Sequence, residues 1–360
     1  MLSSSFYWFS TIIALSFATS VYAAEATGTL IGQVVDDATG QIIPARIYIT
    51  GPDRKTYIPQ ARQGQMIAEY NKRRGPHEHY ACLGPHPFKV ELPTGKSLVQ
   101  IFHGKEYKPI TRQVEITKGL TTESAFKLHS HFNMADQGWY AGDLHVLTPL
   151  TDLPAFQLAE DLNVAFPITA WARDSREVPR IRGGRVPEKG ELIKIDKNHV
   201  YWNLNTEYEI FSLEGSRGKQ GELVQGAIMF LGHQKPFTQT CPPIGPIAAE
   251  ARRQGAIIDW DKHNWPWSAM LVPVAGIETI ELSNNHMWRL TPFVFSRFGE
   301  PAPDWMNRTF DNRGWAEFGF QTYYALLNSG FFIRAGAGTA NGVHPVPLGF
   351  SRVYVKIDGP

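Results

Sequence analysis

The sequence predicts an α/β protein preceded by a small all-β domain, and three observations support this fold class. Short runs of alternating apolar and polar residues, separated by turn residues, fill residues 28–128. From about Trp139 onward, apolar strand-like runs alternate with helix-like runs. The chain has 360 residues, of which 43% are hydrophobic and 19% charged, so two domains can each bury a core. We therefore expect a β-sandwich over residues 24–130 and an α/β domain, layered or barrel-like, over residues 131–360.

The N-terminus is typical of a secretory signal peptide. Residues 6–18 form an apolar run, and Val21 and Ala23 are the small residues that signal peptidase prefers. A membrane anchor is the alternative, because no Lys or Arg precedes the run. However, Ser and Thr interrupt it, and it falls short of the roughly 20 apolar residues that cross a bilayer. We expect residues 1–23 to be cleaved, the protein to be secreted or periplasmic, and no stable membrane span.

Charge and cysteine content narrow the possible partners. The 35 Lys and Arg residues nearly balance the 34 Asp and Glu residues, leaving a net charge of +1. Such a balance gives no field that selects nucleic acid or an anionic membrane, so we expect a small-molecule or glycan substrate. Cys82 and Cys241 could pair in an oxidising compartment, but they are too far apart in sequence for a CxxC metal site.

The first domain is predicted to open with a β-hairpin. Residues 28–35 and 43–50 both alternate as strands do, and the turn residues 36–40 separate them. Residues 54–85 are polar and rich in Gly, Pro and charge, which favours a long surface loop that includes His77 and His79. Further strands are expected at residues 88–92, 97–103, 112–116 and 125–128.

The first helix of the second domain is predicted over residues 153–162, which form an amphipathic segment. Asp152 can cap this helix, and Pro154 suits its first turn. A buried strand should follow at 164–171. Later elements are a helix at 246–253 ended by Gly255, strands at 256–259 and 277–282, a helix at 320–328 before Gly330, and a strand at 352–357.

Candidate chemistry begins with the strand over residues 138–147, which contains Asp143 and His145. Alternate residues of a strand share a face, so a His-x-His pair would direct two imidazoles at one metal ion. This sequence has Leu147 at the second position. In α/β folds, functional residues gather where strands end. The polar residues at such ends are Asp143, His145, Asp174, Glu214, Asp259, Asp261, Lys262, Asn284, Asn285 and His286.

Several segments, in order along the chain, resemble one family. They are residues 28–51, 88–95, 138–145, 159–164, 284–287 and 349–355. In these segments the chain resembles CehA/McbA-type metallohydrolases of the polymerase and histidinol phosphatase (PHP) superfamily, in secreted forms with a carboxypeptidase-regulatory-like β-sandwich in front. The resemblance implies an α/β fold, a distorted PHP-like (β/α) barrel, that binds divalent metal. It also implies that residues beyond 360 belong to the usual domain.

The resemblance carries over to three positions. His145 matches the first histidine of the family's His-x-His motif, Asp143 matches the acid before it, and Glu214 matches a bridging glutamate. Other ligand positions differ. Leu147, residues 169–171, residues 226–227, Asp259 and residues 338–341 stand where the family has further histidines and aspartates.

The resulting site hypothesis uses the residues that remain. Zinc needs about three protein ligands to hold a reactive water, and His145, Glu214 and Asp259 would supply three. Oxygen-rich ligands would suit Mn²⁺ or Mg²⁺ better than Zn²⁺. The residues expected to polarise the substrate or carry protons are Asp143, Lys262 and His286, and those expected to contact the substrate are Asn285 and Trp171.

Two functional interpretations follow. One is a secreted metal-dependent hydrolase that cleaves an ester, amide or phosphoester with metal-activated water. The other is a metal-free, non-catalytic relative that binds an extracellular glycan or another ligand, in which these polar residues only brace loops. The pair His129 and His131 also has alternate spacing, but it lies in the expected interdomain connection.

Overall fold

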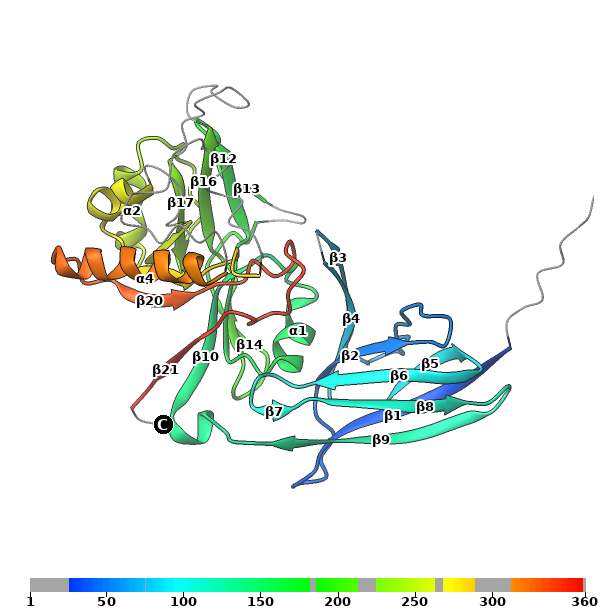
Figure 1. Cartoon of the computed structure of the whole chain (residues 1–360). Coiled ribbons are helices and arrows are strands. Elements are labelled where there is room, and N and C mark those ends of the chain that lie inside the picture. Colours follow the sequence, from blue (N-terminus) through cyan, green and yellow to red (C-terminus); the bar gives the residue numbers. More distant parts are fainter. Residues whose placement is uncertain are drawn as a thin grey trace, which may run out of the picture.

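The computed structural model describes residues 26–74, 76–181, 186–212, 225–262, 268–288 and 312–358. Four β-sheets contain most of the regular secondary structure of this part of the chain. Figure 1 shows the two sheets of residues 27–130 at lower right and the other two toward the left.

Two sheets formed by residues 27–130 pack on one apolar core. The smaller has the spatial order β5 (Phe88–Pro93), β1 (Thr27–Asp36), β9 (Thr121–Ser130) and β7 (Tyr107–Lys108). The larger has the order β3 (Ile67–Arg73), β4 (His77–Leu83), β2 (Ala45–Thr50), β6 (Gly95–Phe102) and β8 (Ile110–Ile116). Leu30 and Phe126 of the smaller sheet meet Ile47 and Val99 of the larger in this core, and all four are fully buried. Alternate residues of both sheets therefore point inward, as in face-to-face packing.

Two expectations for this region are wrong. The expected hairpin at 28–50 does not extend beyond its turn. β1 and β2 belong to different sheets, and the two segments pair only beside the turn, at Val35 and Ile42. The expected surface loop at 54–85 contains the antiparallel strands β3 and β4. Their polar residues hide an alternation in which Tyr70 and Tyr80 point inward.

A third sheet lies next to the β3–β4 pair. Its spatial order is β14 (Leu192–Lys194), β15 (Val200–Trp202), β11 (Val164–Pro167), β10 (Trp139–Val146) and β21 (Val353–Lys356). Helix α1 (Leu153–Ala159) packs against β3 and β4, with Phe156 edge-on to Tyr70 at a ring separation of 5.6 Å. A buried ion pair of 2.5 Å between Arg46 and Glu160 joins the two regions. The sandwich and the third sheet thus share an apolar and charged contact.

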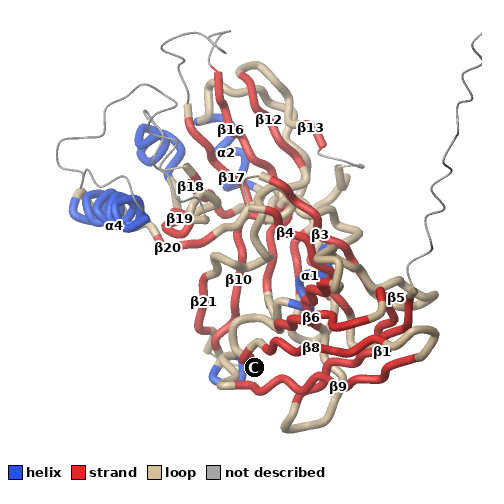
Figure 2. Tube along the Cα trace, turned by 45° about the vertical axis from the view of Figure 1, so that its right-hand side comes forward, coloured by secondary structure: helices blue, strands red, loops and turns tan. Residues whose placement is uncertain are grey.

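The fourth sheet carries the second large core. Its spatial order is β13 (Arg180–Ile181), β12 (Ala170–Asp174), β16 (Thr206–Ser212), β17 (Gly226–Leu231), β18 (Ile257–Asp261), β19 (Thr279–Ser283) and β20 (Arg334–Ala337). Helices α2 (Gly245–Arg253) and α4 (Asn312–Asn328) cover one face of this sheet (Figure 2). Ile247 of α2 and Tyr323 of α4 pack there against Trp260 and its apolar neighbours. The short helical turns η1 (Ala135–Gln137), η2 (Ser268–Met270) and η3 (Val272–Gly276) complete the described elements.

The predicted fold class, a distorted PHP-like (β/α) barrel, is wrong. The described residues contain far more strand than helix, and they form no closed barrel. A barrel of β/α units has parallel strands throughout, whereas β16 and β18 both run antiparallel to β17. The error has a physical cause: the alternation of strand-like and helix-like runs after Trp139, which predicted the α/β domain, does not fix the direction of the strands. A mixed sheet covered on both faces produces the same pattern.

Individual elements were predicted more accurately than their arrangement. The helices expected at 153–162 and 246–253 correspond to α1 and α2, and the one expected at 320–328 is the end of the longer α4. Gly255 and Gly330 have φ of 75° and 88°, the left-handed conformation that ends helices. The strand expected at 164–171 is divided, since β11 belongs to the third sheet and β12 to the fourth.

The cysteines are buried free thiols in the described structure. Cys82 lies in β4, and the Cys241 thiol donates a hydrogen bond of 3.2 Å to Gln225. Among the described helices, none combines the length and apolar character needed to cross a membrane.

Candidate metal centre

One face of the fourth sheet is acidic. On the helix-covered face, Tyr208, Ile228 and Trp260 pack in the apolar core. Strand alternation therefore sends their neighbours to the opposite face. In β16 to β19 that face carries five buried carboxyl groups, those of Glu207, Glu209, Asp259, Asp261 and Glu281. The cross-strand register keeps them together, because Ala227 of β17 pairs with both Glu209 and Asp261.

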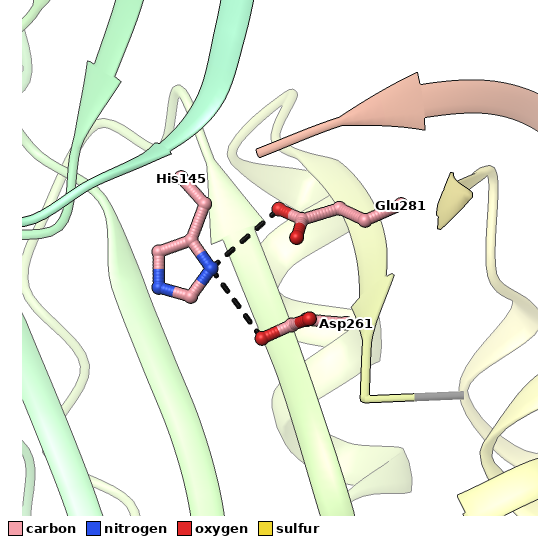
Figure 3. A group of neighbouring side chains, drawn as sticks. All are labelled: His145, Asp261 and Glu281. Carbon is pink, nitrogen blue, oxygen red and sulfur yellow. Dashed lines mark ion pairs between the residues drawn. The ribbon is translucent and has the colours of Figure 1, made fainter. Parts of the chain in front are cut away.

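His145 approaches this acidic face from the third sheet, at the end of β10. Its Nδ1 lies 3.4 Å from Asp261 Oδ2 and 3.6 Å from Glu281 Oε1, and its Nε2 lies 3.5 Å from Glu207 Oε2. Figure 3 shows the Nδ1 edge of the ring directed at the Asp261 and Glu281 carboxylates. His145, Asp261 and Glu281 are each at most 1% exposed to solvent. The imidazole thus joins two sheets through charged groups.

The end of β10 is held in place by the segment after β20. The backbone amide of Ala340 donates to the carbonyl of His145, and the amide of Leu147 donates to the carbonyl of Asn341. Asp143 strengthens this junction by accepting hydrogen bonds from the Thr339 hydroxyl and from three backbone amides, including that of His145. Burial raises the pKa of Asp143 to about 6, although these hydrogen bonds favour its ionised form. Asp143 therefore positions the strand end that bears His145.

Gly338 permits the close approach of His145 to Glu281. A Cβ atom at position 338 would lie 2.5 Å from the Cβ of His145 and closer still to the Glu281 carboxylate. Real Cβ contacts are not this short, so only glycine fits here. The sequence Gly336-Ala337-Gly338 at the end of β20 thus shapes the site.

The three residues His145, Asp261 and Glu281 fit a metal ion. One ligand atom from each lies within 4.8 Å of the other two. Ligands about 2.1 Å from an ion lie roughly 3.0–3.4 Å apart at angles between 90° and tetrahedral, close to the 3.4 and 3.6 Å observed from Nδ1. One imidazole with two carboxylates is a donor set that Mn²⁺, Zn²⁺ or Mg²⁺ accepts. A buried group able to hold a metal ion is therefore present.

The charges of the cluster do not balance among the described residues. Five carboxyl groups face two basic side chains, those of His145 and Lys262. Buried charge without a partner is costly, so the excess carboxyls must take up protons or a cation. Several polar atoms also lack a hydrogen-bond partner within the described structure, namely both ring nitrogens of His145, both Glu281 oxygens, Glu207 Oε1 and Asp259 Oδ2.

The pKa values follow this imbalance. Burial, reinforced by neighbouring acids, raises the pKa of Glu209 to about 7, that of Asp259 to about 7, and that of Glu281 well above its usual range. Burial acts in the same direction on Asp261, but the charges of Lys262 and His145 outweigh it and hold the pKa of Asp261 well below normal. Burial would lower the pKa of His145, yet Glu207 and Glu281 raise it well above normal. Lys262 and His145 thus favour the charged form of Asp261.

The structure brings some predicted site residues together and separates others. His145, Asp259 and Lys262 lie in or beside the cluster, but Asp261 and Glu281, not Asp259, converge on His145. Glu214, the third expected ligand, lies outside the described residues.

The expected substrate-contacting residues occupy two places. Trp171 in β12 pairs in register with Glu207, so its half-buried ring lies on the acidic face one strand from the cluster. Asn285 and His286 follow β19, where the His286 ring lies 6.0 Å from that of His344. His286 therefore lies beside His344 and is not one of the three residues, His145, Asp261 and Glu281, that converge.

Sequence reasoning missed Glu207, Glu209 and Glu281 as members of the cluster, and it placed Asp261 at a strand end without naming it as a ligand. A signal exists for the acids of β16 and β18. Glu207-Tyr-Glu209 and Asp259-Trp-Asp261 place acids two residues apart around a bulky aromatic residue. That spacing predicts an acidic face on a strand whose other face is core.

Comparisons with known proteins do not assign a family. No family profile and no curated protein matches this chain. Among solved structures, the minor pilin GBS52 of Streptococcus agalactiae is similar over 30% of this chain and 47% of its own, at 13% identity and a TM-score of 0.22. Phospholipase PlaB of Legionella pneumophila is similar over 30% of this chain and 26% of its own, at 11% identity and a TM-score of 0.19.

A third similar structure, the TIE protein of Bacillus anthracis, covers 60% of this chain and 30% of its own, at 9% identity and a TM-score of 0.19. This chain thus spans less than half of each of these three proteins. Similarities at this level carry no argument about fold or function, and the metallohydrolase resemblance stays a prediction.

Proposed function

We propose that this protein is a metal-dependent hydrolase that holds one divalent cation between His145, Asp261 and Glu281 and cleaves an ester, amide or phosphoester. The convergence of these three side chains in a cluster with excess carboxyl groups carries the proposal. A bound divalent cation would supply a Lewis acid that makes water a nucleophile near neutral pH.

Residues of the chain have definable tasks in this proposal. Asp259 shares the acidic face with Asp261, and its pKa of about 7 suits a group that exchanges protons near neutrality. Thr279 donates a hydrogen bond to Asp259 Oδ1, which leaves Oδ2 without a partner in the described structure. Trp171 offers an aromatic surface one strand away, suited to the apolar face of a substrate.

The test measures metal content and hydrolysis together. Protein purified without chelator should bind about one equivalent of Mn²⁺ or Zn²⁺ in equilibrium dialysis, and Asp261→Asn and Glu281→Gln should abolish this binding. Glu106→Gln is the matched control, since Glu106 is a buried carboxyl near β7 that accepts hydrogen bonds from Met134 and Tyr354.

Hydrolysis should follow the metal. A panel of chromogenic esters, anilides and phosphodiesters should contain one substrate whose cleavage disappears with chelator and in Asp261→Asn. Absence of bound metal in the wild-type protein would remove this proposal.

A second candidate function rests on a specific observation. The Lys262 ammonium already contacts Asp261, and the cluster is buried. In this alternative the charged groups join the third and fourth sheets without metal, and the protein binds an extracellular ligand without catalysis. Thermal stability that does not change when Mn²⁺, Zn²⁺ or chelator is added would favour this alternative over the hydrolase.

A further inference from the structure

Lys262 follows Asp261 directly and turns back over it. Its φ of 56° is a left-handed conformation that residues with a Cβ rarely adopt. This conformation allows two contacts with one carboxylate: the Lys262 backbone amide donates to Asp261 Oδ1 at 2.7 Å, and its Nζ donates to Asp261 Oδ2. The Lys262 side chain is 3% exposed.

The contacted oxygen is the one that the metal centre needs. Asp261 Oδ2 is the atom nearest His145 Nδ1, at 3.4 Å. Asp261 Oδ1 is already used by the backbone amide of Lys262. The Lys262 ammonium and a cation bound by His145 and Glu281 therefore require the same oxygen.

Lys262 has other carboxylates within reach. Its Nζ lies 3.3 Å from Glu209 Oε1 and 3.7 Å from Glu207 Oε1. A small movement of the ammonium toward β16 would keep it paired while releasing Asp261 Oδ2. The cluster thus contains both the position that the lysine would leave and the partners that would receive it.

We propose that Lys262 is a built-in competitor for the metal centre, whose ammonium occupies Asp261 Oδ2 until a divalent cation displaces it toward Glu209. The inference rests on the proposed cation site and adds the residue that sets its affinity. Lys262 thereby limits binding to cations with enough charge to displace an ammonium, so divalent ions bind and Na⁺ and K⁺ do not.

The experiment compares Mn²⁺ affinity in the wild-type protein and in Lys262→Met by equilibrium dialysis. Removing a unit charge about 4 Å from the ion should tighten binding at least about tenfold. Lys105→Met is the matched control, because Lys105 is an exposed lysine whose ammonium lies over the Phe350 ring, outside the cluster. Its Mn²⁺ affinity should equal that of the wild-type protein.

The outcomes separate this inference from the proposed function. If the wild-type protein binds Mn²⁺ and Lys262→Met binds it no more tightly, the competitor role is overturned and the metal centre stands. If only Lys262→Met binds Mn²⁺, the competitor role is supported and the metal-dependent function of the wild-type chain is overturned. If neither binds, both are overturned.

A second measurement covers loss of folding. In Lys262→Met, His145 is the one basic side chain left among the described residues to face five carboxyl groups, so thermal stability should depend on Mn²⁺ more strongly than in the wild-type protein. Lys262→Gln, which keeps a polar end without charge, should behave in the same way. If both variants are unfolded and Mn²⁺ does not restore their circular dichroism, the proposal is wrong.

Discussion

Two buried charged regions of this molecule differ in how their charges are matched. At the joint between the sandwich and α1, Arg46 pairs with Glu160 at 2.5 Å, donates to the Tyr48 hydroxyl at 2.7 Å, and lies over the Phe102 ring at 4.3 Å. In the cluster around His145, five carboxyl groups share two basic side chains, and six polar atoms have no hydrogen-bond partner in the described structure.

The comparison distinguishes charged groups that are buried to hold the structure together from charged groups that are buried at a functional site. A buried pair with every polar group satisfied needs nothing further and fixes how two elements meet. A buried group with excess charge of one sign is stable only with protons or a bound cation, and perturbed groups of this kind occur at functional sites. The joint should therefore respond to mutation alone, and the cluster to mutation, metal and pH together.

The largest expected effect concerns the matched pair. Arg46→Met leaves the Glu160 carboxylate buried without its partner, and breaking such a pair costs about 3–5 kcal/mol of unfolding free energy. Urea denaturation should show this loss equally with Mn²⁺ and with chelator, because the joint takes no part in metal binding. Lys55→Met is the control, since its pair with Asp53 is exposed and should contribute less than about 1 kcal/mol. A loss in Arg46→Met below that of the control would show that the joint is not structural.

A smaller effect is expected where the two sheets meet at the cluster. Gly338→Ala places a methyl group against His145 and Glu281, and such overpacking costs about 1–3 kcal/mol. Because the two ligands must separate, Mn²⁺ binding should weaken as well. Gly245→Ala is the matched control, since no atom lies near its Cβ position at the start of α2 and its unfolding free energy should stay within about 1 kcal/mol of wild type. Unchanged Mn²⁺ affinity in Gly338→Ala would contradict the geometry of the site.

The two regions also differ in how far sequence could predict them. His145 could be identified as a ligand candidate from its own segment, because a strand-like run there leads into an acid and a histidine. Its partners Asp261 and Glu281 lie on β18 and β19 of the fourth sheet, far from β10 in the sequence. Only the folded arrangement of the third and fourth sheets brings these strands beside β10. The helix ends at Gly255 and Gly330 were predictable from local backbone preference. The antiparallel direction of β17 was not, because a strand buried on both faces has the same composition in either direction.

The third expected effect appears only as the pH changes, and it tests whether the cluster carries excess acid. Burial, opposed by Lys262 and reinforced by the nearby acids Glu207 and Asp261, raises the pKa of Glu209 to about 7, compared with about 4.3 in an unfolded chain. A carboxyl with a raised folded pKa stabilises the fold below the unfolded value, and this contribution is lost as pH rises from about 4 to about 7. Glu209→Gln cannot ionise. In metal-free protein it should therefore match wild type near pH 4 and be more stable at pH 8, by up to about 4 kcal/mol.

Denaturation curves at the two pH values measure this difference, with Glu115→Gln, an exposed carboxyl of β8, as the control. The Glu115 variant should show the same small difference from wild type at both values. Mn²⁺ should reduce the gain in Glu209→Gln, because a bound cation compensates the charge that the variant removes. A Glu209→Gln variant less stable than wild type at pH 8 would mean that the attraction between Lys262 and the Glu209 carboxylate outweighs the cost of burying that negative charge. The charges of the cluster would then be balanced, like those at the joint around Arg46.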